Sequence, residues 1–171
     1  MRHLTKISIL MAMMSIAIFS CGDNDEEKRE YDYHFTPPPS WTIGINSADD
    51  MAVYEGPADS DFNPQISVCT NNSGLTLDEF VDGFINGWST DNYYALVSRT
   101  DFKTNGGLSG TKAVFLYRLY SNDDDLRFVV YILPPKSGSK TYAAIICIGL
   151  SEWGTKYDTM FETSAKSFAW K

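Results

Sequence analysis

LTLDEFVDGFINGW, residues 75–88, is the stretch where the hydrophobic period of this chain changes from that of a strand to that of a helix. Its apolar residues fall at i, i+3, i+4, i+7, i+8 and i+11, on one stripe of an α-helix: Leu77, Phe80, Val81, Phe84, Ile85 and Trp88. Thr76 and Glu79 occupy the two positions of a capping box. Glycines at 83 and 87 weaken the helix by about 1 kcal/mol each, so tertiary packing must hold it.

Strand-like runs lie on both sides of this helix, at residues 41–45, 51–54, 65–69, 94–102, 111–120, 126–133 and 141–150. Short polar turns join several of them, which predicts antiparallel neighbours. The run 143–148 is apolar on both faces and predicts a central strand covered by helices. A second helical stripe begins at Trp153 and ends at Phe168. The sequence therefore predicts an α+β fold, an antiparallel sheet of about seven strands flanked by two helices.

The N-terminus has the layout of an export signal. Arg2 and Lys6 precede an apolar stretch, residues 7–19, that is too short to cross about 30 Å of hydrocarbon as a helix. The end of this stretch and the two residues after it, Ile18-Phe19-Ser20-Cys21, resemble the bacterial lipobox, although Phe19 is bulkier than is usual there. We expect residues 1–20 to be a lipoprotein signal peptide and Cys21 to be the lipidated first residue of the mature protein. Several acyl chains on one cysteine form an effectively permanent membrane anchor.

Residues 21–40 are expected to be an acidic, proline-ended disordered tether, and residues 41–171 a single globular domain. The acidic residues just after Cys21 resemble the surface-export signals of bacterial lipoproteins, but a plain solvated spacer explains them equally well. Loss of residues 1–20 removes two basic and no acidic residues, which changes the net charge from −8 to −10. Such a charge argues against nucleic acid as a partner. We expect the lipid-anchored protein to be located at the outer membrane or on the cell surface.

Residues 41–171 resemble the PsbP-like superfamily, which includes DcrB-type lipoproteins and a eukaryotic Ran-binding transport factor. The resemblance rests on the order of these features: the opening WTI at 41–43, the MAVYEGP at 51–57, the helix at 75–88, the GGLSGTKA at 106–113 and a closing helix that ends at Phe168. It implies an α/β/α sandwich and a non-enzymatic binding or assembly role. No ligand-binding residue of the superfamily has a matching motif in this chain.

Residues suited to catalysis are scarce. His34 is the only histidine after the signal and lies in the predicted tether, so histidine catalysis and zinc binding are not expected. The segment DSDFN, 59–63, begins like a calcium loop, but it lacks the glycine, and Thr70 stands where glutamate is required. The stretch GGLSGTK, 106–112, leads into a strand and is expected to be a turn, not a phosphate loop. We expect no catalytic residue, no metal and no cofactor.

Cys69 and Cys147 are the cysteines of the predicted domain. Each lies in an apolar, strand-like run, so two separate core thiols are the simpler interpretation, and a disulfide in an oxidising envelope stays open. Tyrosines at 93, 94, 117, 120 and 131 are expected mostly in the core, with an exposed aromatic contact patch as the alternative.

These features favour a lipid-anchored, non-enzymatic envelope domain that docks another envelope protein. A surface lipoprotein that binds a small molecule, a glycan or an ion is the alternative. A hydrolase that uses carboxylates alone is a third hypothesis, and it requires two acids that converge in a cleft.

Overall fold

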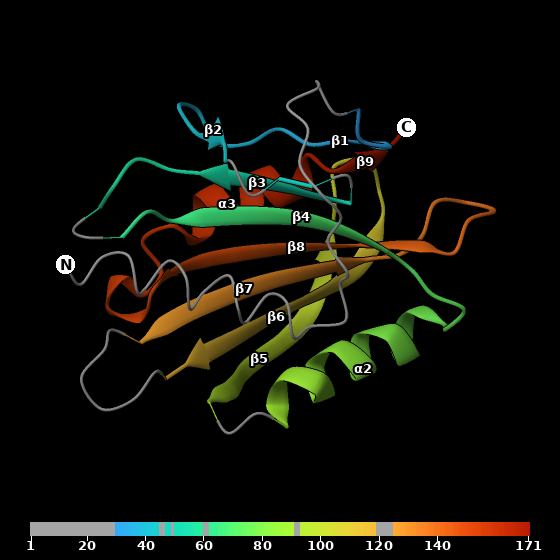
Figure 1. The fold of residues 1–171 in the computed structure, drawn as a ribbon. Helices are drawn as coiled ribbons and strands as arrows, with labels where there is room; N and C mark the ends of the chain where they lie inside the picture. The colour runs from blue at the N-terminus through green and yellow to red at the C-terminus, as the bar shows by residue number, and fades with distance from the viewer. Residues whose placement is uncertain (1–29, 45–46, 49, 60–61, 91–92, 119–124) are drawn as a thin grey trace.

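The computed structural model describes residues 30–44, 47, 48, 50–59, 62–90, 93–118 and 125–171. A seven-stranded antiparallel sheet, in the order β2-β3-β4-β8-β7-β6-β5, forms its centre (Figure 1). The strands are β2 Thr42–Ile43, β3 Met51–Glu55, β4 Gln65–Asn72, β5 Tyr94–Lys103, β6 Ser109–Tyr117, β7 Leu126–Leu133 and β8 Thr141–Leu150. Helix α2, Leu77–Ser89, and helix α3, Asp158–Lys166, flank it. The predicted fold class is confirmed.

Two apolar clusters cover the two faces of the sheet. The helices lie on opposite sides, α2 toward the viewer in Figure 1 and α3 behind the sheet. On the α3 side, Phe161 and Ala165 of the helix pack on strand residues such as Ile145 and Cys147. Residues one position away in the same strands, including Ile146, belong to the cluster on the α2 side. Alternation along a strand sends successive side chains to opposite faces, so the central strand β8 is buried on both.

Helix α2 is held at its start by the capping box that the sequence predicts. The Thr76 hydroxyl accepts from the Glu79 amide at 3.4 Å, and the Glu79 carboxylate accepts from the Thr76 amide at 2.8 Å. The hydrogen bonds that the Thr76 amide and hydroxyl donate to the carboxylate lower the pKa of Glu79. The second predicted helix is shorter than expected. A 3₁₀ turn, η1 Ser151–Trp153, ends at Gly154 with φ +54°, and α3 begins only at Asp158.

The prediction of a disordered tether is wrong for residues 30–40, the part of it that the structure describes. Strand β1, Tyr33–His34, pairs with the C-terminal strand β9, Ala169–Trp170, as a separate two-stranded sheet. Tyr33 is 5% exposed and stacks on Phe168, with ring centroids 5.3 Å apart. The domain therefore includes the segment 30–36, because the aromatic residues at 31, 33 and 35 supply enough apolar area to order it. Residues 1–29, with the signal peptide and Cys21, lie outside the described residues.

The corrected boundary gives a direct test of stability. Tyr33→Ala should lower the free energy of unfolding by about 3 kcal/mol, because it removes a buried ring from the core. The control is His34→Ala, since His34 is the exposed neighbour in the same strand and should change stability by about 0.5 kcal/mol or less. Urea titration followed by tryptophan fluorescence measures both. Equal stability of the two variants would contradict an ordered β1.

Candidate binding surface

Helix α2 covers only part of its side of the sheet, which we call the α2 face. It packs mainly on β5 and β6 (Figure 1). A helix is about 10 Å wide and strands lie about 4.8 Å apart, so one helix covers about two strands. The remaining strands of the α2 face carry no helix within the described part of the chain. An apolar sheet with a partial cover is a candidate for binding.

Three aromatic side chains of α2 point along one flank of the helix, and we call Phe80, Phe84 and Trp88 the aromatic row. Val81 and Ile85 are the buried residues of α2, whereas the aromatic row is only partly buried. Phe80 stacks on Tyr142, with centroids 4.3 Å apart and planes at 11°. The row follows the edge of α2 and reaches from β8 to the ring cluster at the start of β5.

The other end of the row is set in that ring cluster. The Trp88 ring lies 5.0 Å from Phe84, 4.9 Å from Tyr94, 5.1 Å from Phe115 and 5.3 Å from Phe128, measured between centroids. Edge and tilted contacts of this kind fix the ring orientation and exclude water between the rings. The aromatic row is therefore a preformed wall.

Beyond the row, an apolar strip crosses the α2 face over β3, β4 and β8. We define the apolar strip as Val53, Ser67, Cys69 and Ile146. The register places Val53 opposite Ser67 and Ser67 opposite Ile146, so these side chains share one face. All four are 5% exposed or less, although neither α2 nor α3 lies over them (Figure 1). The Ser67 hydroxyl is fully buried and forms no hydrogen bond within the described part of the chain.

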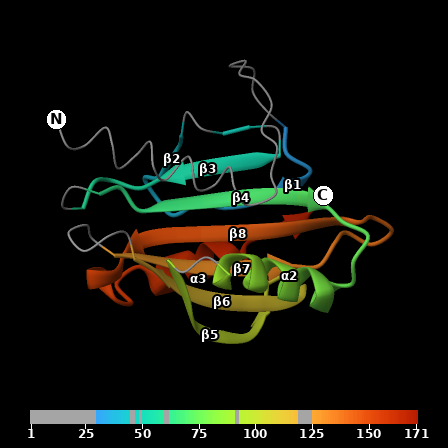
Figure 2. The same cartoon turned by 60° about the horizontal axis from the view of Figure 1, so that its bottom comes forward.

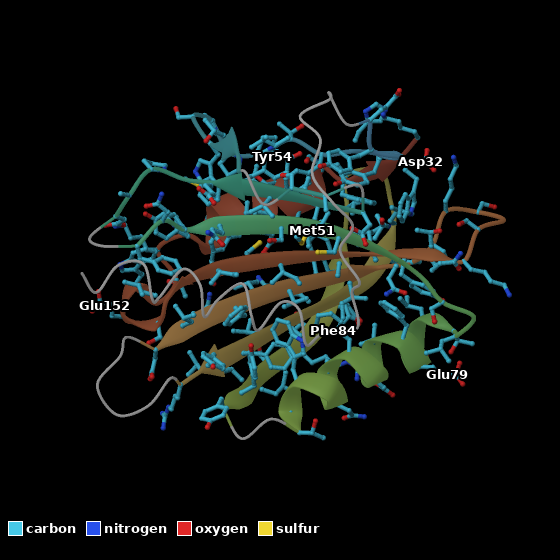
Figure 3. The ribbon with its side chains drawn as sticks, in the orientation of Figure 1. Asp32, Met51, Tyr54, Glu79, Phe84 and Glu152 are labelled. Carbon is cyan, nitrogen blue, oxygen red and sulfur yellow. The ribbon has the colours of Figure 1, made fainter. Side chains whose placement is uncertain are left out.

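Partly buried apolar residues border the strip on the side away from α2. Met51 lies on β3, and Figure 3 labels it on the same face as Phe84 of the aromatic row. Phe62 and Trp153 contact each other edge to face at 5.8 Å near the end of β8. The α2 face thus has an apolar floor, aromatic borders and one hydroxyl. This composition suits an apolar peptide segment or an acyl chain. Hydrophobic periodicity placed the row on the apolar stripe of the helix, but it does not reveal that the row is only partly buried or that the Ser67 hydroxyl is buried.

The predicted calcium-like segment is engaged in a different interaction. Asp59 accepts a hydrogen bond from the Lys156 ammonium and another from the Tyr157 hydroxyl at 2.6 Å. The Lys156 ammonium also lies over the rings of Trp153 and Tyr157, at 5.7 and 5.4 Å. The hydrogen bonds from Lys156 and Tyr157 lower the pKa of Asp59, whereas burial and the bond to Asp59 raise the pKa of Tyr157 to about 12. Residues 60 and 61 of this segment lie outside the described residues.

Two acids on α3 lie one turn apart, and both are ion-paired. The Arg127 guanidinium donates two hydrogen bonds, of 2.5 and 3.0 Å, to the Asp158 carboxylate. Glu162 accepts from Lys112 at 3.0 Å and contacts Lys166 at 2.7 Å. Hydrogen bonds from Lys166 and Lys112 lower the pKa of Glu162, so it is ionised at neutral pH. A carboxylate hydrolase needs a proton donor with a raised pKa, and Glu162 does not supply one.

The two cysteines of the domain are separated by the sheet. Cys69 lies in the cluster on the α2 face and Cys147 in the cluster under α3, and both thiols are buried without a disulfide. Cys147 stands opposite Ile66 of β4, and Ile66 lies three positions before Cys69 in the same strand. Residues an odd number of positions apart in a strand point to opposite faces, so the side chains of Cys69 and Cys147 do so as well. The disulfide that the sequence left open is contradicted. Burial raises the pKa of the Cys147 thiol.

The remaining predicted positions take ordinary structural roles. Residues 104–108 form a turn, with Gly107 at φ +88°, and lead into the strand β6, as the sequence predicted. Tyr117 and Tyr131 are buried, Tyr94 is half-buried and Tyr93 is 37% exposed. Tyr120 lies outside the described residues.

Within the described ranges, no three acidic, histidine or cysteine side chains come together as a metal site. None of the helices described is both long and apolar enough to cross a bilayer.

No family model and no curated protein matches this chain. Among solved structures, LpqN of Mycobacterium tuberculosis, involved in cell envelope biogenesis, aligns with a TM-score of 0.61 and 11% identity over 84% of this chain and 86% of LpqN. Cyanobacterial PsbP (CyanoP) of Synechocystis sp. PCC 6803 gives 0.58 and 15% over 90% of this chain and 99% of that chain. The chain has the PsbP-like fold. The Saccharomyces cerevisiae Ran-binding protein Mog1p gives 0.59 and 10%, over 88% and 96%. The predicted resemblance is confirmed for the fold.

The Asp59 contacts predict how stability depends on pH. A folded-state pKa below the unfolded value means that the ionised Asp59 stabilises the fold above the unfolded pKa, and that this contribution is lost as pH falls through the folded pKa. Asp59→Asn should therefore unfold at a lower urea concentration than the wild type at neutral pH, with the difference vanishing in acid. Asp32→Asn, which changes an exposed carboxylate, is the control. A difference that is independent of pH would contradict the ionic contribution.

Proposed function

We propose that this chain is a lipid-anchored, non-enzymatic binding domain of the bacterial cell envelope, which docks another envelope protein on its α2 face. The observation that carries the proposal is the aromatic row of α2, whose rings are only partly buried. The residues of the apolar strip are themselves buried, and the partly buried rings of the row form an apolar border beside them, of the kind that marks an interaction site. A partner that lays an apolar segment along the aromatic row would bury the part of these rings that is still exposed.

The geometry of the α2 face favours an elongated occupant. Phe80, Phe84 and Trp88 are spaced four residues apart on one helix, which gives a row about two turns long. The strip runs beside it, and Met51 borders the far side. An amphipathic helix or an extended apolar segment of a partner fits such a row-and-strip arrangement.

The anchor is proposed from the N-terminal sequence. Arg2, Lys6, the apolar residues 7–19 and the lipobox-like Ile18-Phe19-Ser20-Cys21 have the order of a lipoprotein signal. The involvement of LpqN in cell envelope biogenesis agrees with an envelope location, and the Ran binding of Mog1p agrees with a protein partner. The outer membrane or the cell surface is the proposed site of the anchor.

Lipidation can be tested apart from docking. Cells grown with an alkyne analogue of palmitate should label the full-length protein, and Cys21→Ser should abolish the label and move the protein from the membrane to the soluble fraction. Cys69→Ser is the matched control, because Cys69 is buried in the domain and its loss should leave the label in place. Label that persists in Cys21→Ser would exclude the proposed anchor site.

Docking can be tested with a photocrosslinking amino acid in the full-length protein in its native cells. Position 84, on the aromatic row, should yield an adduct with one envelope protein, whereas position 160, where Met160 is 38% exposed on α3, should not. Met51→Asp in the same protein should reduce the adduct several-fold, because a charge at the border of the strip must be desolvated on docking. Adducts of equal yield at both positions, or an adduct that Met51→Asp leaves unchanged, would overturn the proposal.

A small apolar molecule is the second candidate for the α2 face. The observation that favours it is the Ser67 hydroxyl, which is fully buried and lacks a hydrogen bond among the described residues. A buried polar atom in an apolar floor is the usual way in which a pocket orients a small ligand. In the crosslinking experiment, an adduct at position 84 with the mass of a lipid instead of a protein would favour this alternative.

A further inference from the structure

Strand β5 is an open edge of the seven-stranded sheet. It is the last strand in the order, its one partner among the described strands is β6, and Figure 2 shows it as the outer strand of the sheet. It contains 10 residues, whereas β2 at the opposite edge contains two. A long edge strand presents unpaired amide and carbonyl groups to which another strand can bind. This edge is separate from the apolar strip, so the inference below does not depend on the proposed function.

The side chains of β5 are exposed over most of its length. Residues 95–101 are all exposed, including the apolar Leu96 at 42% and Val97 at 57%. A register shift between Leu96 and Ser98 interrupts the pairing with β6, and from Ser98 to Lys103 the register is regular. Bulges and charges commonly protect an edge strand from association. The charges of this strand, however, alternate in sign along the regular part: Arg99, Asp101 and Lys103.

We propose that β5 binds the β5 strand of a second copy of this chain, antiparallel, across a twofold axis at Thr100. This register places Arg99 opposite Asp101 of the second copy twice, because the axis repeats the pair. Thr100 then faces its own equivalent, and Ser98 faces Phe102. Opposite charges and paired threonines are both favourable cross-strand neighbours.

The neighbouring registers are unfavourable. A twofold axis perpendicular to the sheet keeps the two faces, so each residue must oppose a residue an even number of positions away in the sequence. The axis therefore passes between two equivalent residues, one from each copy. Moving it by one residue places Arg99 opposite its own equivalent, or Asp101 opposite its own equivalent. Like charges directly opposite destabilise a strand pair. The sequence of β5 therefore selects the register at Thr100 from these three.

The arginine of this pair is already positioned inside the protomer. Arg99 Nη1 donates to Asp82 Oδ1 of α2 at 2.6 Å, which holds the guanidinium on the α2 face. Arg99 stands opposite Ala113 and Asp101 opposite Thr111, two positions apart on β6, so Asp101 presents its carboxylate on the same face. Asp101 is exposed and has no ion pair among the described residues. Arginine has five donors, so Arg99 can contact Asp82 and the second copy together.

A charge exchange tests the register. The full-length protein, purified in detergent, is examined by sedimentation equilibrium as wild type, Arg99→Asp, Asp101→Arg and an equal mixture of the two variants. The wild type should dimerise, and each variant alone should raise the dimer dissociation constant by about tenfold or more, because two attractive pairs become repulsive. The mixture should regain wild-type affinity, since every Asp then faces an Arg. Monomeric wild type, or variants that dimerise as well as the wild type, would overturn the proposal.

Disulfide crosslinking tests the axis in intact cells. Thr100→Cys brings two new thiols together on the axis, at the spacing of directly opposed cross-strand residues, and mild oxidation should link the two copies. Ser98→Cys is the matched control, because its equivalent in the second copy lies about 13 Å away along the strand. Cys69 and Cys147 are buried. These two cysteines and Cys21 are present in all variants, so they do not account for a difference between them. Equal crosslinking of the two variants, or none with Thr100→Cys, would exclude an axis at Thr100.

Discussion

The structure depends on the burial of β8 on both faces. Eight consecutive residues of this strand, 143–150, are buried, and the strand lies at the centre of the sheet with β4 and β7 on either side. A strand of this kind requires an apolar layer above and below it. Below, α3, Trp41 and the N-terminal aromatic residues form a continuous layer. Above, α2 lies mainly on β5 and β6, so no helix of the described part of the chain covers all of β8, and the partly buried aromatic row at the edge of α2 is the candidate site.

Local patterns in the sequence predicted the parts of the fold that local interactions determine. The bounds of β7 and β8 agree with the predicted runs, because each run is apolar and ends at polar turn residues. The start of α2 was predicted from Thr76 and Glu79, whose hydrogen bonds span only three residues. The PsbP-like arrangement followed from the order of these elements, so the fold could be predicted although no matched structure reported above shares more than 15% identity with the chain.

Contacts between distant segments could not be predicted in this way. Tyr33 pairs with Trp170, and nothing in the residues around either position reveals the other. The charged residues before Tyr31 and the prolines after Thr36 suggested disorder for the whole segment, whereas the intervening aromatic rings anchor it. Helical periodicity likewise placed Phe80, Phe84 and Trp88 with the buried Val81 and Ile85, because it gives the side of the helix and not the number of strands beneath it. Ser67 reads as an ordinary strand residue until its face is known.

The α2 face and the β5 edge are related by the symmetry of the proposed dimer. A twofold axis perpendicular to a sheet exchanges the two copies without exchanging the faces, so both α2 helices would lie on the same side of one continuous sheet. The two apolar strips would then face the same direction, and the two lipid anchors proposed at Cys21 would hold the pair to one membrane. Two linked sites that face one way bind a repeated or dimeric partner more tightly than either site alone, through a higher effective concentration at the second site. On this argument the edge strand determines how many strips a partner meets, and the α2 face determines what it binds.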